Sequence, residues 1–218
     1  MSTISFFEDI QALNVMAFHD AALARDDFTS SPRQFSEGVW AWIEANHFNN
    51  TSLWAEEDLA RRTTVSGDEI AQNKRHIDGF NQARNDATER VDEEILVRMK
   101  PVSEFQNSGA RLNSETAGAM IDRMSIMSLK IKAMRAQTLR TDVDAAHIEK
   151  CTEKLNTLLE QRTDLGACLN GLLAEMQAGH AYYKIYRQFK MYNDKTLNPE
   201  LVKEQARWFE EGEFDWLS

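Results

Sequence analysis

The stretch WAWIEANHFNNTSLWAEEDLARR (residues 40–62) decides the fold, together with the TTVSG that follows it (residues 63–67) and the charged run over residues 68–99. In both long runs apolar side chains recur every three or four residues, which predicts two helices. Ser66 followed by Glu69 is a capping box, so the second helix begins directly after the turn. A turn this short predicts that the two helices form an antiparallel hairpin.

The rest of the chain continues the helical pattern. With 9 glycines and 3 prolines in 218 residues, the composition favours long helices over a many-turned β fold. We predict a single all-α domain over residues 1–218, an antiparallel bundle of about five long helices plus a short C-terminal helix. The first expected helix runs from Phe6 to about Asp26, the second from Ser31-Pro32 to Arg62, and the third ends near Met99 before Pro101. A loop over residues 100–113 follows, and then a fourth helix from Ser114 or Glu115 to Arg140. The fifth runs from Asp142 to about Tyr192, with a bend near Gly166, Gly171 or Gly179, and a last helix begins at Asn198-Pro199.

Charge and composition exclude several classes of protein. Acidic residues outnumber basic ones 35 to 25, which gives a formal net charge of -10 and argues against nucleic acid as the main partner. No run of 18 apolar residues occurs and no targeting signal is visible, so we expect no membrane span. Cys151 and Cys168 lie too far apart on one expected helix to form a disulfide. We therefore expect reduced thiols in a cytoplasmic protein.

Each helix of the hairpin carries a stripe that is apolar at its ends and polar in its middle. If the turn is centred within TTVSG, residues at the same level have numbers that sum to 131. The predicted pairs are Glu57 with Lys74, Trp54 with Ile77, Asn50 with Asn81, and His47 with Arg84. Polar groups on an inward stripe are costly to bury unless they bind each other or a ligand. Either the layer fixes the helix register or it lines a site, and its density of polar groups favours a site.

Such a site would suit an anionic small molecule. Cationic and amide side chains contact the oxygens of an anion, while a histidine and carboxylates can perform acid–base chemistry. The candidate catalytic residues are His47, Glu57, Asp58 and Asp78. The candidate ligand-binding residues of the hairpin are Asn50, Trp54, Lys74, Asn81, Arg84 and Asn85.

Three carboxylates farther along the hairpin suit a metal ion. Asp86, Glu89 and Asp92, with Glu57 or Asp58 across the hairpin, could hold Mg²⁺ through oxygen ligands. This chemistry would belong to an Mg-dependent all-α phosphohydrolase. It is a lesser alternative, because Glu-x-x-Asp spacing occurs on many charged helices. The cofactor is otherwise left open.

The stretch HAYYKIYRQFKMYNDK (residues 180–195) reverses the charge of the chain locally and alternates basic with aromatic side chains. This mixture suits an anionic ligand or an acidic partner surface. It adds Lys190, Tyr192 and Asn193 to the candidate ligand-binding residues. An ordinary amphipathic helix end, with tyrosines on the core and lysines in water, is the simpler and favoured interpretation.

Four blocks of the sequence carry a family resemblance. The first contains Trp54-x-x-Glu57-Asp58, the second Asn81-Gln82-x-Arg84-Asn85-Asp86, and the others lie within residues 115–130 and 189–199. They resemble the bacterial family known as domain of unknown function 4254, except that Ala117 stands where that family has proline. The resemblance implies a cell-envelope context of surface-polysaccharide assembly and supplies no reaction.

Two classes of function follow. The leading hypothesis is a cytoplasmic helical bundle with a polar inter-helical site for an anionic small molecule, such as a phosphorylated or nucleotide-linked sugar. The alternative is a non-catalytic interaction protein that docks a glycosyltransferase or forms a homodimer through the long fifth helix. Whether the protein is an enzyme is left open.

Overall fold

The computed structural model describes residues 6–103, 109–187 and 194–212, in two compact units, residues 1–185 and residues 186–218. Nearly all of the regular structure in the described part is helical, which confirms the all-α prediction. Its elements are α1 (Ala12–Leu23), α2 (Gly38–Leu59), α3 (Gly67–Ser103), β1 (Arg111–Leu112), α4 (Ala117–Thr138), α5 (Ala145–Gln177), β2 (Ala181–Tyr182) and α6 (Pro199–Gly212).

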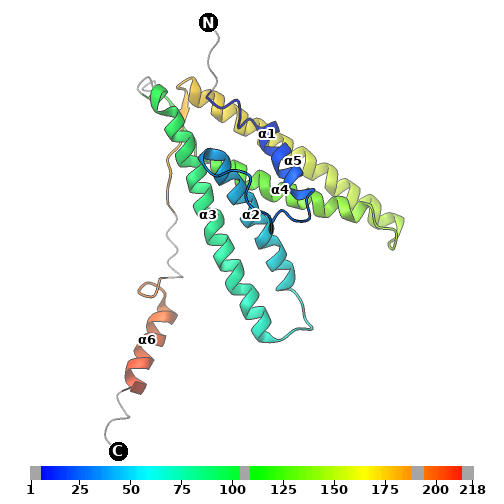
Figure 1. Cartoon of the computed structure of the whole chain (residues 1–218), viewed down its shortest axis with the longest axis vertical. Coiled ribbons are helices and arrows are strands. Elements are labelled where there is room, and N and C mark those ends of the chain that lie inside the picture. The colour runs from blue at the N-terminus through cyan, green and yellow to red at the C-terminus, as the bar shows by residue number, and fades with distance from the viewer. Residues whose placement is uncertain (1–5, 104–108, 188–193, 213–218) are drawn as a thin grey trace, which may run out of the picture. The chain divides into compact units, whose positions relative to one another are not determined.

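Helices α2 and α3 form the predicted antiparallel hairpin (Figure 1). The predicted cap is present, because Ser66 Oγ accepts the N–H of Glu69 at 3.2 Å. The side-chain contacts between the two helices include Asn73 with Glu56 at 2.7 Å and Asn46 with Thr88 at 3.1 Å. The numbers of these pairs sum to 129 and 134, against the predicted 131. The register is therefore close to the prediction, although the residues in contact differ.

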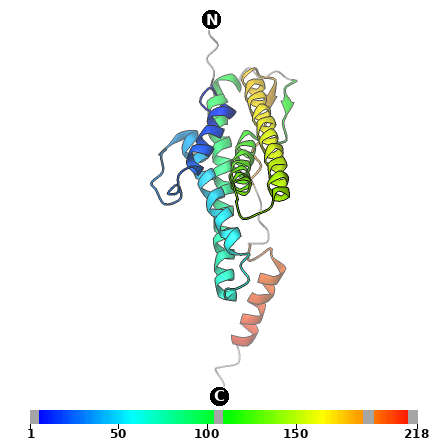
Figure 2. The same cartoon turned by 90° about the vertical axis from the view of Figure 1, so that its right-hand side faces the viewer.

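Helices α4 and α5 form a second hairpin, and α1 packs against both (Figures 1 and 2). Each helix of this hairpin has a side-chain cap: Thr116 Oγ1 accepts the N–H of Ala119 at 3.1 Å, and Asp144 Oδ1 accepts that of His147 at 2.8 Å. The apolar faces of the two helices supply much of the core. Their fully or largely buried members include Met120, Ile121, Met124, Ile131, Leu165, Leu169, Leu172, Leu173 and Met176.

Helix α1 is attached at both of its ends. The N–H of Ala12 donates to Asn170 Oδ1 of α5 at 2.8 Å, and Lys132 of α4 donates to the carbonyl of Leu23 at 2.7 Å. Gly166 permits the close approach of the two helices, because a Cβ there would lie 3.0 Å from Ala12 Cβ. These contacts hold the inward face of α1 over the second hairpin.

The predicted start of the second helix is wrong. Helix α2 begins at Gly38, which has φ +70°, and not at Ser31-Pro32. The carboxylate of Glu44 accepts the backbone N–H groups of Gln34 and Phe35 at 2.8 and 2.9 Å. This tertiary contact satisfies donors that a helix would otherwise leave unpaired at its first turn, so the segment before Gly38 stays non-helical.

The predicted extent of the fifth helix is also wrong, since α5 ends at Gln177. Gly179 has φ +74°, and its N–H and that of His180 donate to the carbonyls of Met176 and Glu175, which is a Schellman motif. The chain then forms β2, which pairs in parallel with β1 from the expected loop over residues 100–113. Helix α3, expected to stop before Pro101, continues to Ser103.

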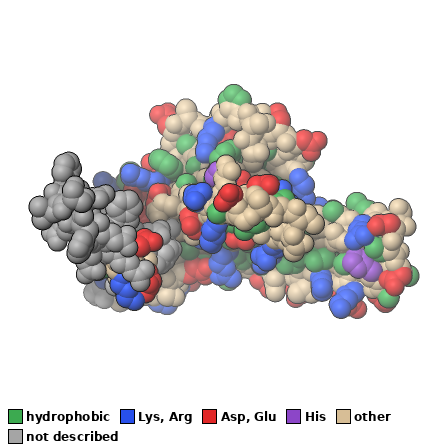
Figure 3. Space-filling view, turned by 90° about the horizontal axis from the view of Figure 1, so that it is seen from below, with side chains coloured by type: hydrophobic (Ala, Val, Ile, Leu, Met, Phe, Trp, Pro, Cys, Tyr) green, Lys and Arg blue, Asp and Glu red, His purple; other side chains and the backbone are tan. Residues whose placement is uncertain are grey.

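The second unit contains α6, which begins at Pro199 as predicted, with Asn198 Oδ1 accepting the N–H of Glu200 at 2.9 Å. Among the helices of the described residues, none is long and apolar enough to cross a membrane. On the face of the molecule seen in Figure 3, acidic and basic side chains are interspersed. The net negative charge is therefore not gathered into one patch on that face.

Candidate functional site

A buried polar layer begins on the inward face of α2, which carries Asn46, His47 and Asn50. Helical spacing puts Asn46 and Asn50 on the same side, opposite Asp122 and Ser125, which are three residues apart on α4. Both amides donate to one oxygen, Asp122 Oδ1, at 2.8 and 2.9 Å. Two helices are thus joined through a single carboxylate.

The hydrogen bonds around Ser125 set the protonation of His47. Asn50 donates to Ser125 Oγ at 3.0 Å, so the serine hydroxyl is free to donate its own proton to His47 Nδ1, 2.8 Å away. This arrangement places the imidazole proton on Nε2. With this tautomer Nε2 faces the backbone of His19, which opposes the lowering of the His47 pKa.

The ring of His47 stacks on the ring of His19 from α1, with centroids 4.4 Å apart and planes at 28°. Both rings are fully buried. Burial lowers the pKa of His47 to about 4 and lowers that of His19 well below its usual value. The stacked pair is therefore neutral at pH 7.

One end of the layer is an ion pair between α1 and α5. Arg162 of α5 binds both carboxylate oxygens of Asp20, at 2.6 and 3.1 Å, and also donates to Ser128 Oγ of α4 at 3.0 Å. The Arg162 side chain is 11% exposed and that of Asp20 is 50% exposed. This end of the layer is therefore reached from solvent on the carboxylate side.

At the other end, Arg84 of α3 lies beside Asp122. Its Nε is 3.8 Å from Asp122 Oδ1, too far for a hydrogen bond, while its Nη2 donates to Asn85 at 3.1 Å. The two side chains of this pair are 23% and 14% exposed, so the layer meets solvent here as well. Among the described residues, the buried side-chain atoms without a hydrogen-bond partner are Arg84 Nε, Asn50 Oδ1, His47 Nε2 and both ring nitrogens of His19.

The outer part of the hairpin does not join this layer. Glu57 pairs with Arg61 at 3.5 Å and Lys74 with Asp78 at 3.8 Å, each one turn along its own helix. The predicted pair of Glu57 with Lys74 is therefore replaced by contacts within each helix. Asp58 is exposed, and Asn81 and Trp54 are half-buried. Trp54 lines an apolar groove with residues of α4 and α5.

The three candidate metal ligands differ in their surroundings. Asp92 is buried and accepts the N–H of Gly118 at 2.6 Å, whereas Asp86 is exposed and accepts from Gln82 at 2.6 Å. Glu89 is half-buried. Burial raises the pKa of Asp92 to about 6. In the part of the chain that the structure describes, no group of three or more metal-ligating side chains could hold an ion.

The basic and aromatic candidates Lys190, Tyr192 and Asn193 lie outside the described residues. The stretch before them is not the predicted helix, since it begins with β2. Tyr183 is buried there, and its hydroxyl donates to the backbone carbonyl of Asp92 at 3.2 Å. At least this tyrosine thus packs on the core, as the simpler interpretation of the stretch requires.

Seven members of the layer were not among the predicted site residues: His19, Asp20, Asn46, Asp122, Ser125, Ser128 and Arg162. Two of them interrupt apolar stripes, which is a signal that the sequence does contain. Arg162 follows Leu158 and precedes Leu165 at helical spacing, and His19 follows Val15 in the same way. Asp122 and Ser125 lie in the third block of the family resemblance.

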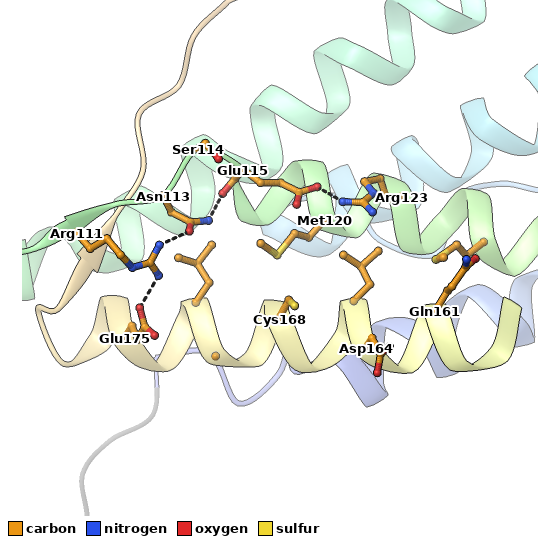
Figure 4. A pocket seen from close by; sticks show the side chains of 14 residues that line it. Arg111, Asn113, Ser114, Glu115, Met120, Arg123, Gln161, Asp164, Cys168 and Glu175 are labelled. Carbon is orange, nitrogen blue, oxygen red and sulfur yellow. Dashed lines mark hydrogen bonds and ion pairs between the residues drawn. The ribbon is translucent and has the colours of Figure 1, made fainter. Parts of the chain in front are cut away.

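A trough of about 720 Å³ lies between α4 and α5, apart from the polar layer (Figure 4). Its floor is apolar and contains Met120, Met127, Leu165 and Leu172. Arg111 pairs with Glu175 at 2.7 Å and Arg123 with Glu115 at 2.6 Å along its rim. Cys168 is exposed in this trough, and Cys151 is buried elsewhere on α5; both are free thiols.

Fold and site together define an all-α protein whose two helical hairpins enclose a polar layer open to solvent at both ends. The family model described as "Protein of unknown function (DUF4254)" matches residues 40–185, about two thirds of the chain. The protein belongs to this family. Comparison with curated proteins finds no match, and comparison with solved structures finds none either.

Proposed function

We propose that the first unit binds an anionic small molecule at the edge of the polar layer formed by Arg84 and Asp122. One observation carries this proposal: the buried Nε of Arg84 has no hydrogen-bond partner, although a carboxylate lies 3.8 Å away. A buried donor without a partner costs about 1–3 kcal/mol. An anion at this edge would satisfy it.

The neighbouring amides explain why Asp122 does not neutralise Arg84 fully. Asn46 and Asn50 both donate to the oxygen that faces the guanidinium, and this holds the carboxylate toward α2. Arg84 therefore retains hydrogen-bonding capacity, and its planar fork matches phosphate or carboxylate oxygens. His47 is too deeply buried to touch a ligand here. It acts as a positioning residue through Ser125 and Asn50.

The ligand class comes from two considerations. A phosphate or a similar oxyanion matches the planar fork of the arginine. The cell-envelope context that the family resemblance implies makes sugar phosphates and nucleotide-linked sugars the first compounds to test.

The test is a thermal-shift screen of sugar phosphates, nucleotide sugars and nucleotides, each with Mg²⁺ and with EDTA. A ligand at 100 times its Kd raises the midpoint by roughly 5–10 °C in a chain of this size. We expect a saturable shift that Arg84→Gln abolishes and that Arg75→Gln, an exposed arginine of the same helix, leaves intact. A shift that survives Arg84→Gln would contradict the proposal. A shift that requires Mg²⁺ would instead favour the metal site predicted at Asp86, Glu89 and Asp92.

The trough between α4 and α5 favours a second candidate function, self-association. Arg123 of α4 and Asp164 of α5 line opposite sides of the trough, so a two-fold axis along it would bring Arg123 of one copy, now paired with Glu115, toward Asp164 of the second copy (Figure 4). A homodimer through α5 would then cover the apolar floor. Mild oxidation should link two copies through Cys168, and Cys168→Ser should abolish the link. A monomer by light scattering that forms no such link would rule this function out.

A further inference from the structure

The ion pair beneath α1 has the geometry of a ligand-binding site. Arg162 presents both terminal nitrogens to the two oxygens of Asp20, at 2.6 and 3.1 Å, and Ser128 Oγ lies 3.0 Å from the same guanidinium. Bidentate contact of this kind is how arginine recognises a free carboxylate or phosphate. The cation is nearly buried, whereas the carboxylate is half-exposed.

The two partners come from different parts of the chain. Arg162 and Ser128 lie within residues 40–185, which the family model matches, whereas Asp20 lies on α1, before the matched region. The carboxylate that binds Arg162 of the second hairpin therefore comes from α1, a helix that precedes the region matched by the family model. Both carboxylate contacts of Arg162 depend on that helix.

The surroundings of the pair contain further unused donors. His47 Nε2 has no hydrogen bond within the usual geometric limits, although the backbone of His19 lies near enough to oppose the lowering of the His47 pKa. Both ring nitrogens of the adjacent His19 are also buried without partners. Asp20 is close enough to influence the titration of His47. An anion with more oxygens than a carboxylate could engage groups that Asp20 leaves free.

We propose that Arg162, which Ser128 Oγ holds in place as an acceptor while donating its own proton to the Met124 carbonyl, forms an anion-binding site beside the His47–His19 pair. Asp20 occupies this site, and a phosphate-class anion competes with Asp20 for it. This site lies at the opposite end of the layer from Arg84 and does not rest on the function proposed there. The carboxylate of α1 stands in for the ligand. Helix α1 thus acts as an internal competitor of the site.

Removing the carboxylate should leave α1 in place. The backbone contacts of Ala12 with Asn170 and of Leu23 with Lys132 do not involve Asp20. The apolar face of α1 also remains, since Val15 is fully buried and Ala22 nearly so. Asp20→Ala therefore opens a space beside Arg162 without detaching the helix.

The experiment compares melting midpoints in sodium phosphate and in sodium chloride of equal ionic strength. Asp9→Ala is the matched control, because Asp9 binds Arg98 at 2.7 and 3.1 Å with the same fork geometry, while the further contact of Arg98 is with the Phe6 carbonyl instead of a serine hydroxyl. We expect Asp20→Ala to gain a saturable increase of about 3–6 °C at ten times the Kd for phosphate, beyond that of Asp9→Ala and the wild type. Arg162→Gln added to Asp20→Ala should remove that increase, and Arg84→Gln should not.

Asp20→Asn, which keeps the side-chain volume, is measured in parallel. A variant that folds in phosphate but not in chloride supports the site. The proposal is overturned if both Asp20 variants respond to phosphate no more than Asp9→Ala does, or if they fail to fold in either salt.

Discussion

Asp92 shows what burial does to a single carboxyl group in this protein. It is 3% exposed, and loss of water raises its pKa to about 6, although the N–H of Gly118 favours the charged form. Because the folded pKa lies above the unfolded value of 3.8, Asp92 contributes stability that is fully present below pH 3.8. This contribution is lost as pH rises through 6.

We therefore predict that Asp92→Asn gains stability relative to wild type as pH rises from 4 to 7. The size of the change should be on the order of 1–3 kcal/mol. The lowered pKa of His47 acts in the opposite direction, since its contribution is present above pH 6.5 and is lost as pH falls toward 4. The histidine is common to both proteins and cancels in their difference. Urea unfolding at several pH values measures the difference in the free energy of unfolding between Asp92→Asn and wild type. A difference that does not change with pH would contradict the prediction.

At the scale of elements, Gly118 determines how closely α4 approaches α3. A Cβ at this position would lie 2.6 Å from the carbonyl oxygen of Thr88 and 2.9 Å from Asp92 Cγ. We predict that Gly118→Ala lowers the free energy of unfolding by about 1–3 kcal/mol, because the backbone of α3 or α4 must shift to make room for the added methyl group. In Gly171→Ala, where a Cβ meets nothing within 4 Å, stability should rise by about 0.5–1 kcal/mol. Equal losses in the two variants would contradict the close approach.

The elements were predictable where their signals are local. The Ser66 capping box and the stripes on either side of it predicted the first hairpin and its register to within a few residues. The predicted ends of elements were wrong where a contact with a residue outside the element decides them. Glu44 captures the N–H groups of Gln34 and Phe35, and β1 pairs with a strand about 70 residues later. No stripe or cap in one segment contains that information.

The same limit applies to the site. His47 and Asn50 were predictable as inward polar groups, because helical spacing alone puts them on the buried face of α2. Their partners were not, since His47 contacts His19 and Ser125 rather than Arg84. The predicted pairs came from the register of α2 and α3 alone, whereas five helices contribute side chains to the layer. The choice of partner depends on how α1 and α4 cross the hairpin.

At the scale of the whole molecule, the polar layer runs through the first unit from Arg84 to Arg162 and joins all five of its described helices. Each end carries an arginine beside an aspartate, and the neutral histidine pair lies between them. Such a layer is costly to bury if it serves packing alone. The unpartnered Nε–H donor of Arg84 is the reason to assign a ligand at that end.

The most direct test observes the Nε–H of Arg84 by ¹H–¹⁵N NMR, with the signal assigned by its loss in Arg84→Gln. The titrant is the sugar phosphate or nucleotide sugar that gives the largest thermal shift. We predict that this proton signal moves downfield and saturates with the titrant, because an oxyanion accepts the hydrogen bond of the Arg84 Nε–H. A titrant that binds while the Arg84 signal stays in place would contradict the proposed site.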